Sequence, residues 1–242
     1  MKDAYRQSGW RLALAAGLFV TGLAGIVISG TVAQAAEPEA TGFPVYKPPL
    51  RGTPVARMGG GTRGEGDDAP EVYVLTPEHT GLTSQAQPVL YWYLSRAVKA
   101  RYEFVLMAEM DYEPLVEAEL KTVVSAGIQR IALADFGAEL KPGVPYQWSV
   151  AVVMDEDQRS GDILASGMIE HLVPPAGIMT RVANASGEAR VGQYAGAGLW
   201  YDALQSLDEL IRSGKNVTRL EQVRASLLEQ VGLQNVAVAV GG

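Results

Sequence analysis

The chain has 242 residues, no cysteine and a formal net charge of −7 at pH 7. Its acidic balance argues against binding to nucleic acid or to an anionic membrane surface. The lack of cysteine excludes disulfides, thiol nucleophiles and zinc sites of the His/Cys type, so the fold must depend on an ordinary hydrophobic core.

The N-terminus has the pattern of a secretory signal peptide. A basic start, an apolar run over residues 12–28 and Ala33-Gln34-Ala35 predict a signal peptide over residues 1–35, cleaved after Ala35. An uncleaved anchor is the alternative, because the apolar run is near the lower length limit for a membrane span. Cleavage removes three of the 20 basic and one of the 27 acidic residues, so the net charge becomes about −9. We therefore expect a periplasmic or secreted protein whose mature chain has no membrane span.

Residues 36–70 are predicted to be an extended or disordered linker, because six of the thirteen prolines and seven glycines fall within residues 37–70. The linker includes Gly59-x-Gly61-x-x-Gly64, which has the spacing of a dinucleotide-binding loop. Such a loop needs a strand before it and a helix after it, and neither is indicated here. No cofactor is therefore predicted.

Residues 71–173 are predicted to form a β-sandwich, so the fold class is mainly β. Short alternating runs separated by turn residues are typical of an all-β domain, and seven of them are present. The predicted strands cover residues 71–76, 88–94, 102–109, 114–121, 128–134, 145–154 and 162–172.

The stretch from Leu140 to Trp148 predicts an immunoglobulin-like sandwich. Leu140, the Pro142-Gly143 turn and Tyr146 at the start of a strand are typical of a tyrosine corner. We expect the Tyr146 phenol to bond to the backbone near Leu140 and to satisfy a carbonyl there. Trp148 occupies the place of the second cysteine of an antibody domain, so the sandwich resembles a fibronectin type III domain, in which apolar packing replaces the disulfide.

Strand alternation predicts which side chains are buried. The expected core consists of Leu90, Trp92, Leu94, Tyr102, Phe104, Leu106, Ile131, Leu133, Tyr146, Trp148, Val150 and Val152. Tyr91 and Tyr93 are expected to point outward, as are Val105, Met107, Ala151, Val153, Leu164 and Met168. The last six residues make an apolar outer face, which we expect the C-terminal helices to cover.

Residues 174–242 have a helical period and are predicted to form a C-terminal helical hairpin. The expected helices cover residues 179–197, 199–213 and 219–231. The run from Gly198 to Leu210 resembles the second helix of a tetratricopeptide repeat, and Gly232 follows Gly198 at that repeat's period. A plain hairpin docked on the sandwich is the simpler interpretation, because each repeat must bury its apolar face on a neighbour.

The order of several short motifs resembles one bacterial exported family, the one known as domain of unknown function 928. The motifs are Gly59-Gly60-Gly61-Thr62-Arg63-Gly64, Thr76-Pro77-Glu78, Gly81-Leu82-Thr83, Pro88-x-Leu90-x-Trp92-Tyr93, Tyr146-x-Trp148, Arg159-Ser160-Gly161-Asp162, Ser166-Gly167-x-Ile169 and Gly198-Leu199-Trp200-Tyr201-Asp202-Ala203-Leu204. The resemblance covers about residues 50–235 and implies an exported protein of unassigned activity. It supplies no catalytic residues.

The sequence contains no recognisable catalytic motif. His79 and His171 are the only histidines, and both are predicted to be surface residues. Acidic residues cluster in two loops, at Glu109, Asp111 and Glu113 and at Asp155, Glu156, Asp157 and Asp162, but without EF-hand spacing.

The favoured hypothesis is a non-enzymatic cell-envelope protein that binds a partner protein through its helices, at Trp200 and Tyr201. The second hypothesis is a carbohydrate-binding or calcium-binding module that uses Tyr91, Tyr93 and the loop acids. The third is an unrecognised hydrolase that depends on His79, His171 or an acidic loop.

Overall fold

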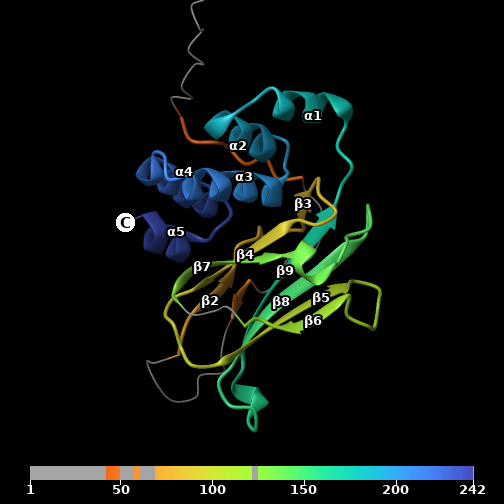
Figure 1. Cartoon of the computed structure of the whole chain (residues 1–242), viewed down its shortest axis with the longest axis vertical. Helices are drawn as coiled ribbons and strands as arrows, with labels where there is room; N and C mark the ends of the chain where they lie inside the picture. The colour runs from red at the N-terminus through yellow and green to blue at the C-terminus, as the bar shows by residue number, and fades with distance from the viewer. Residues whose placement is uncertain (1–41, 50–56, 60–68, 122–124, 242) are drawn as a thin grey trace, which may run out of the picture. The chain divides into compact units, whose positions relative to one another are not determined.

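The computed structural model describes residues 42–49, 57–59, 69–121 and 125–241. The predicted signal peptide, its cleavage site and much of the predicted linker, including Gly61 to Gly64, lie outside these residues. The described part contains nine strands, two short 3-10 helices and five α-helices (Figure 1). The strands are β1 (Met58–Gly59), β2 (Val72–Val74), β3 (Gly81–Thr83), β4 (Val89–Leu94), β5 (Arg101–Ala108), β6 (Val116–Glu119), β7 (Gly127–Ala132), β8 (Pro145–Val153) and β9 (Ile163–His171). The 3-10 helices are η1 (Leu133–Phe136) and η2 (Arg159–Gly161), and the α-helices are α1 (Ala176–Ala183), α2 (Gly187–Gly196), α3 (Trp200–Arg212), α4 (Val217–Gln230) and α5 (Gln234–Gly241).

The strands form two sheets. One sheet has the order β1-β2-β4-β7, and the other has the order β3-β9-β8-β5-β6. All neighbouring strands are antiparallel except β3 and β9, which run parallel. The prediction of seven strands is therefore too low. It missed β1 and β3, and with five helices the chain is mixed α/β rather than mainly β.

The predicted core is confirmed. All twelve side chains expected inside the sandwich are buried, including Trp92, Phe104 and Trp148, which are completely inaccessible to solvent. Strand β5 shows why, because it sends every second side chain to the interior. The rings of Trp92 and Tyr102 lie 5.9 Å apart and join the two sheets.

The tyrosine corner forms, but its hydrogen bond has the opposite polarity to the prediction. The backbone N–H of Lys141 donates to the Tyr146 phenol oxygen at 3.2 Å, so the phenol accepts and satisfies no carbonyl of the turn. The Leu140 carbonyl instead accepts a hydrogen bond from Nδ1 of His171 at 3.0 Å. His171 is buried, so its prediction as a surface residue is wrong. Gly143 adopts a φ of 74°, which favours glycine at this turn.

The C-terminal region consists of five helices rather than a hairpin. The predicted helix over residues 179–197 is two helices, α1 and α2, separated at Asn184, Ala185 and Ser186. Gly187 starts α2 with a φ of 53°. This left-handed conformation cannot occur inside a continuous right-handed helix, so α1 and α2 are separate. Helices α3 and α4 agree with their predicted ranges to within a few residues, and α5 was not predicted.

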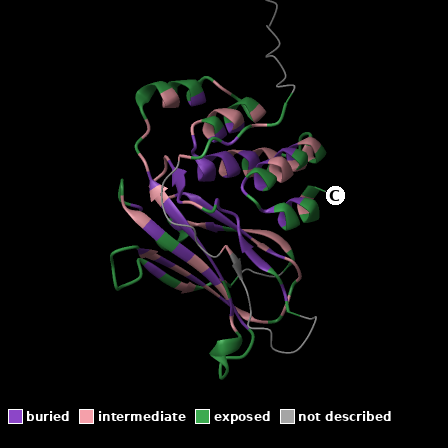
Figure 2. Cartoon of the chain, turned by 180° about the vertical axis from the view of Figure 1, so that it is seen from behind, coloured by how far each residue is buried: buried purple, intermediate pink, exposed green. Residues whose placement is uncertain are grey.

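The helices cover a different sheet face from the predicted one. Tyr91 on β4 donates a hydrogen bond to Asp208 of α3, and Tyr73 on β2 accepts one from Asn235 of α5. These contacts lie on the outer face of the β1-β2-β4-β7 sheet. On the outer face of the other sheet, Val105, Met107 and Ala151 are half-buried and Leu164 is exposed, whereas Val153 and Met168 are buried. Figure 2 shows the distribution of burial along the chain: the loops after β5 and β8 are exposed, and the first turn of α3 is buried.

Part of the predicted linker is packed on the helices. Tyr46 is buried, and the edge of its ring meets Trp200 at a centroid distance of 5.0 Å. The backbone N–H of Lys47 donates to the Ala195 carbonyl at 3.1 Å. The prediction of a disordered linker therefore does not hold for residues 42–49, which pack on the helices and which we call the N-terminal strap.

Candidate functional site

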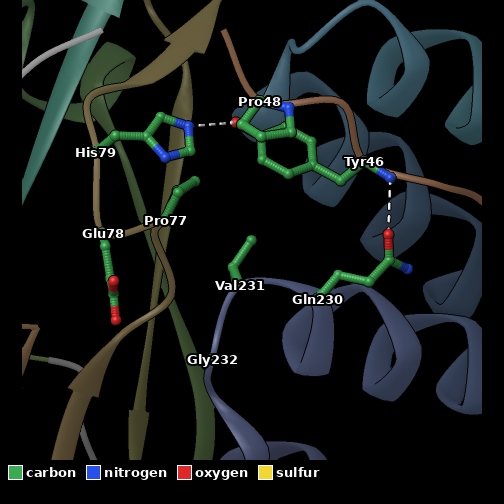
Figure 3. A pocket seen from close by; sticks show the side chains of 8 residues that line it. All are labelled: Tyr46, Pro48, Pro77, Glu78, His79, Gln230, Val231 and Gly232. Carbon is green, nitrogen blue, oxygen red and sulfur yellow. Dashed lines mark hydrogen bonds between the residues drawn. The ribbon is translucent and has the colours of Figure 1, made fainter. Parts of the chain in front are cut away.

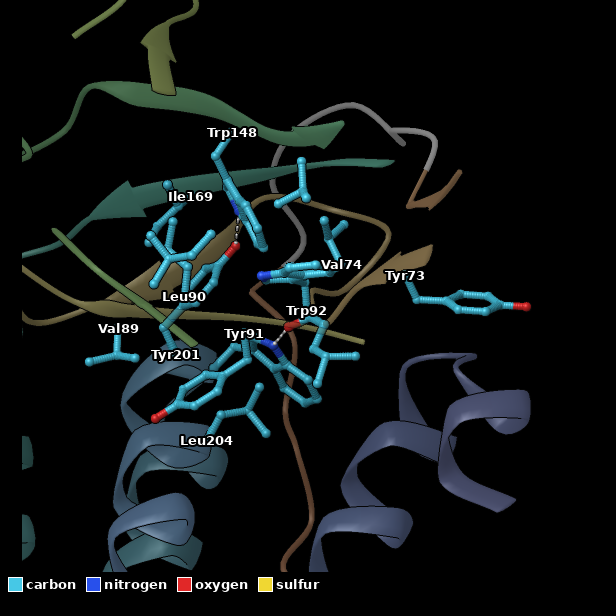
Figure 4. Close-up of a cluster of buried hydrophobic side chains, with 14 of the residues drawn as sticks. Tyr73, Val74, Val89, Leu90, Tyr91, Trp92, Trp148, Ile169, Tyr201 and Leu204 are labelled. Atoms are coloured by element: carbon cyan, nitrogen blue, oxygen red, sulfur yellow. Dashed lines mark hydrogen bonds between the residues drawn. The ribbon is translucent and has the colours of Figure 1, made fainter. Parts of the chain in front are cut away.

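The first turn of α3 connects the helices to the sandwich through hydrogen bonds in the interior (Figure 4). The Trp148 indole donates to the Tyr201 hydroxyl at 2.9 Å. That hydroxyl donates to the Met168 carbonyl and also bonds to Thr76 Oγ1, each at 3.0 Å. Beside it, the Trp200 indole donates to the Leu75 carbonyl at 2.8 Å. Strands β8 and β9, the segment after β2 and helix α3 therefore meet at Tyr201.

Asp202 adds a buried carboxylate to this junction. The backbone N–H of Ser84 donates to Asp202 Oδ2 at 2.9 Å, and the Ser84 hydroxyl donates to Oδ1. Burial raises the pKa of the Asp202 carboxyl, while the hydrogen bonds from Ser84 oppose that change. The carboxylate thus holds the segment that follows β3 against α3.

Two glycines make room for Tyr201 and Thr76. A Cβ atom on Gly81 would lie 2.7 Å from Cε2 of Tyr201, and one on Gly167 would lie 2.5 Å from Cγ2 of Thr76. Both distances are shorter than side chains tolerate, so glycine is needed at each position for close approach. Several motifs that are far apart in the sequence therefore meet at this one junction.

The predicted partner-binding residues lie mostly inside the chain. Trp200, Tyr201 and Tyr91 are buried, and each donates a hydrogen bond to another part of the chain. Tyr93 is half-buried and lies 6.4 Å from the Tyr73 ring. These positions leave Trp200 and Tyr201 without an accessible surface for a partner, and they leave Tyr91 without a free face for a sugar ring.

A pocket of about 270 Å³ opens between the N-terminal strap, the segment after β2 and the turn between α4 and α5 (Figure 3). The residues that line it are Tyr46, Pro48, Pro77, Glu78, His79, Gln230, Val231 and Gly232. The Tyr46 hydroxyl and His79 Nε2 lie 3.1 Å apart, and the Tyr46 backbone N–H donates to Gln230 Oε1 at 2.8 Å. The strap is thereby bonded to both other walls.

Arg57 and His79 set the charge at this pocket. The Arg57 guanidinium donates to the Val231 and Thr76 carbonyls and pairs with Glu78 at 2.8 Å. Burial lowers the pKa of His79, and the nearby Arg57 lowers it further, against a smaller opposite effect of Glu78. His79 is thus a half-buried, hydrogen-bonded residue of the pocket wall at the surface of the chain.

A second pocket, of about 330 Å³, lies on the outer face of β5 and β6. It is lined by Arg101, Glu103, Val105, Glu117, Ala118 and Glu119. Glu103 is held by Arg101 at 2.6 Å and by Arg159 at 2.7 Å, and Arg159 also pairs with Asp162 at 2.6 Å. The hydrogen bonds from Arg159 lower the pKa of the Glu103 carboxyl, although burial opposes them.

The loop between β5 and β6 carries three exposed apolar side chains. Met110, Tyr112 and Leu115 are 87%, 100% and 45% exposed. We call residues 109–115 the hairpin loop. In the described ranges, no group of three or more His, Asp or Glu residues could hold a metal ion. The same ranges include no helix that is both long enough and apolar enough to cross a bilayer.

A search of the curated proteins found no significant match. Among solved structures, the chain is similar to an engineered protein at 6% identity and a TM-score of 0.30, which covers 44% of this chain and 21% of that one. It is also similar to Astrotactin-2, a vertebrate-specific, perforin-like membrane protein involved in neuronal development, at 13% identity and a TM-score of 0.27. That match covers 71% of this chain and 35% of the Astrotactin-2 chain. The chain therefore spans about a third or less of the length of each of these two solved chains.

A protein-family model gives a more extensive match. The model described as Domain of Unknown Function (DUF928) matches residues 58–240, a range that includes every described strand and nearly all of the last helix. The family resemblance expected from the short motifs is thereby confirmed. The chain belongs to the DUF928 family.

Proposed function

We propose that this protein is an exported, non-enzymatic module that binds a partner protein in the cell envelope through its hairpin loop. The observation that carries the proposal is the exposure of Met110 and Tyr112, at 87% and 100%. A large apolar side chain that stays in water at the tip of a rigid scaffold is typical of a contact site, because functional residues are concentrated on such loops.

We infer that the scaffold is an immunoglobulin-like sandwich. The order β2-β4-β7 opposite β9-β8-β5-β6 corresponds to the two sheets of that class, with β3 crossing over to pair with β9. The tyrosine corner lies at the start of β8, where that class has it. Loops at the ends of such sandwiches commonly carry recognition.

The roles of the two histidines support a non-enzymatic protein. His171 donates to a backbone carbonyl inside the sandwich, and His79 is bonded to Tyr46 in a pocket wall. Both imidazoles thus hold parts of the chain together. Export is supported by the predicted signal peptide, and cell fractionation with N-terminal sequencing of the mature chain tests it.

Photo-crosslinking tests the proposed contact. A photoreactive amino acid in place of Tyr112 is expected to form a discrete crosslinked product in intact cells. The double substitution Met110→Ser with Leu115→Ser should weaken that product. The matched control is Val173→Ser with Val238→Ser, which removes two other exposed apolar side chains, 68% and 76% accessible. Equal crosslinking in both double variants, or no discrete product at all, would contradict the proposal.

A further inference from the structure

Among the strands that the structure describes, β6 is an edge strand with one side unpaired. It is the last strand of the sheet β3-β9-β8-β5-β6 and pairs only with β5 among the described strands. The backbone N–H of Leu120 donates to the Tyr102 carbonyl at 2.7 Å, so even-numbered residues of β6 bond toward β5. Because the bonding direction alternates along an antiparallel strand, the N–H and C=O groups of Glu117 and Glu119 point to the open edge.

The side chains of these two residues carry uncompensated charge. Glu117 and Glu119 are exposed and stand opposite Val105 and Glu103 of β5, on the outer face of the sheet. They form no ion pair with any described residue, whereas Glu103 already binds Arg101 and Arg159. Neither of these two carboxylates of the 330 Å³ pocket therefore has a cationic partner in the described part of the chain.

From these observations we propose that the open edge of β6 binds an extended, basic segment of the partner protein, which adds to the sheet as a further strand. Its backbone bonds to Glu117 and Glu119, and its lysine or arginine side chains lie opposite these two carboxylates. Main-chain bonding to a sheet edge provides the affinity, and the alternate side chains provide the specificity. The inference rests on the proposed function, because the hairpin loop joins β5 to β6 and so borders the same edge.

The acidic side chains also discriminate between partners. Charges on an edge strand keep apolar strands from pairing with it. The same two carboxylates would repel an acidic segment and attract a basic one, since cross-strand pairs of opposite charge are favourable and pairs of like charge are not. If Glu117 and Glu119 serve only to protect the edge, a basic extended peptide should not bind there.

The test uses the full chain and a fluorescent peptide of about eight residues in which lysine alternates with threonine and valine. Fluorescence anisotropy at low salt is expected to show binding that weakens as ionic strength rises. The double substitution Glu117→Gln with Glu119→Gln should weaken binding about tenfold, the combined effect of two cross-strand charge pairs. The control is Glu139→Gln with Glu229→Gln, which removes the same charge at two exposed positions elsewhere and should leave binding nearly unchanged.

Peptide variants separate strand addition from simple charge attraction. Methylating alternate backbone nitrogens of the peptide in the register that faces β6 should abolish binding, whereas methylation in the other register should not. The peptide with glutamate in place of lysine should not bind. The inference is overturned if no peptide binds, if both double variants weaken binding equally, or if both methylated peptides bind as well as the parent. None of these results depends on crosslinking at the hairpin loop, so the proposed function succeeds or fails separately.

Discussion

Substitution of Tyr201 by phenylalanine should destabilise the whole described unit without changing its shape. The hydroxyl accepts from the Trp148 indole and donates to the Met168 carbonyl, in a position with no access to solvent. Removing it leaves the indole N–H buried without a partner. A buried donor that loses its acceptor costs about 1–3 kcal/mol.

The expected loss of unfolding free energy is therefore about 2–3 kcal/mol, because the Met168 carbonyl and Thr76 hydroxyl lose a partner as well. For a protein of this size, each kcal/mol lowers the melting temperature by about 2–4 °C, so a decrease of about 4–12 °C is expected. Urea unfolding followed by tryptophan fluorescence measures the free energy, and circular dichroism measures the melting temperature.

Tyr194→Phe is the matched control. Tyr194 is half-buried on α2, and its hydroxyl has no hydrogen bond to any described residue. Its loss should change stability by less than about 0.5 kcal/mol. If Tyr201→Phe were as stable as Tyr194→Phe, the Trp148 indole would have another partner and the junction described here would not hold the helices to the sandwich.

Three further predictions concern the glycines, the tyrosine corner and His79. Gly167→Ala should lower the unfolding free energy by about 1–3 kcal/mol, because its Cβ would meet Thr76. Gly192→Ala on α2 should raise it by up to about 1 kcal/mol, because the added Cβ would meet no atom within 4 Å apart from the backbone of its own helix. Urea unfolding should therefore give changes of opposite sign for the two variants. Tyr146→Phe should lower the unfolding free energy by about 1 kcal/mol in the same assay, because the Lys141 N–H loses its acceptor. An unchanged free energy would show that water replaces the phenol as the acceptor. His79 should titrate below 6.5 in NMR spectra assigned with His79→Gln, and the unfolding free energy should fall as the pH falls through 6.5, because the unfolded chain binds the proton more readily. A titration of His79 at or above 6.5 would contradict the arrangement of Tyr46 and Arg57 around it.

The alternation of apolar residues was sufficient to predict the long strands and the core. Strands β5 and β8 have eight and nine residues, so the period of two is clear. Strands β1 and β3 have two and three residues, too few to show a period, and β3 is held by pairing with β9 and by Ser84 bonding to Asp202. The break between α1 and α2 depends on a single glycine conformation that the helical period does not reveal.

The positions of Trp200 and Tyr201 could not be predicted for a different reason. The sequence marks both as large aromatic residues on a helix, and such residues serve equally well at a partner surface and in a core. Their placement depends on partners 125 and 53 residues away, at Leu75 and Trp148. The small residues Gly81 and Gly167 were the available signal, because they leave space that a ring can enter.

The contact between the N-terminal strap and α4 has a consequence for the order of folding. Tyr46 donates to Gln230 across 184 residues, and Arg57 donates to Val231 across 174. These contacts close only after almost the entire chain has emerged, and contacts of such long range slow folding because the loop entropy must be lost first. Tyr73 and Tyr91 are therefore expected to stay exposed to solvent until α3 and α5 pack on their sheet. In the exported protein that we propose, these contacts would keep the native state from forming before residue 231 has been made.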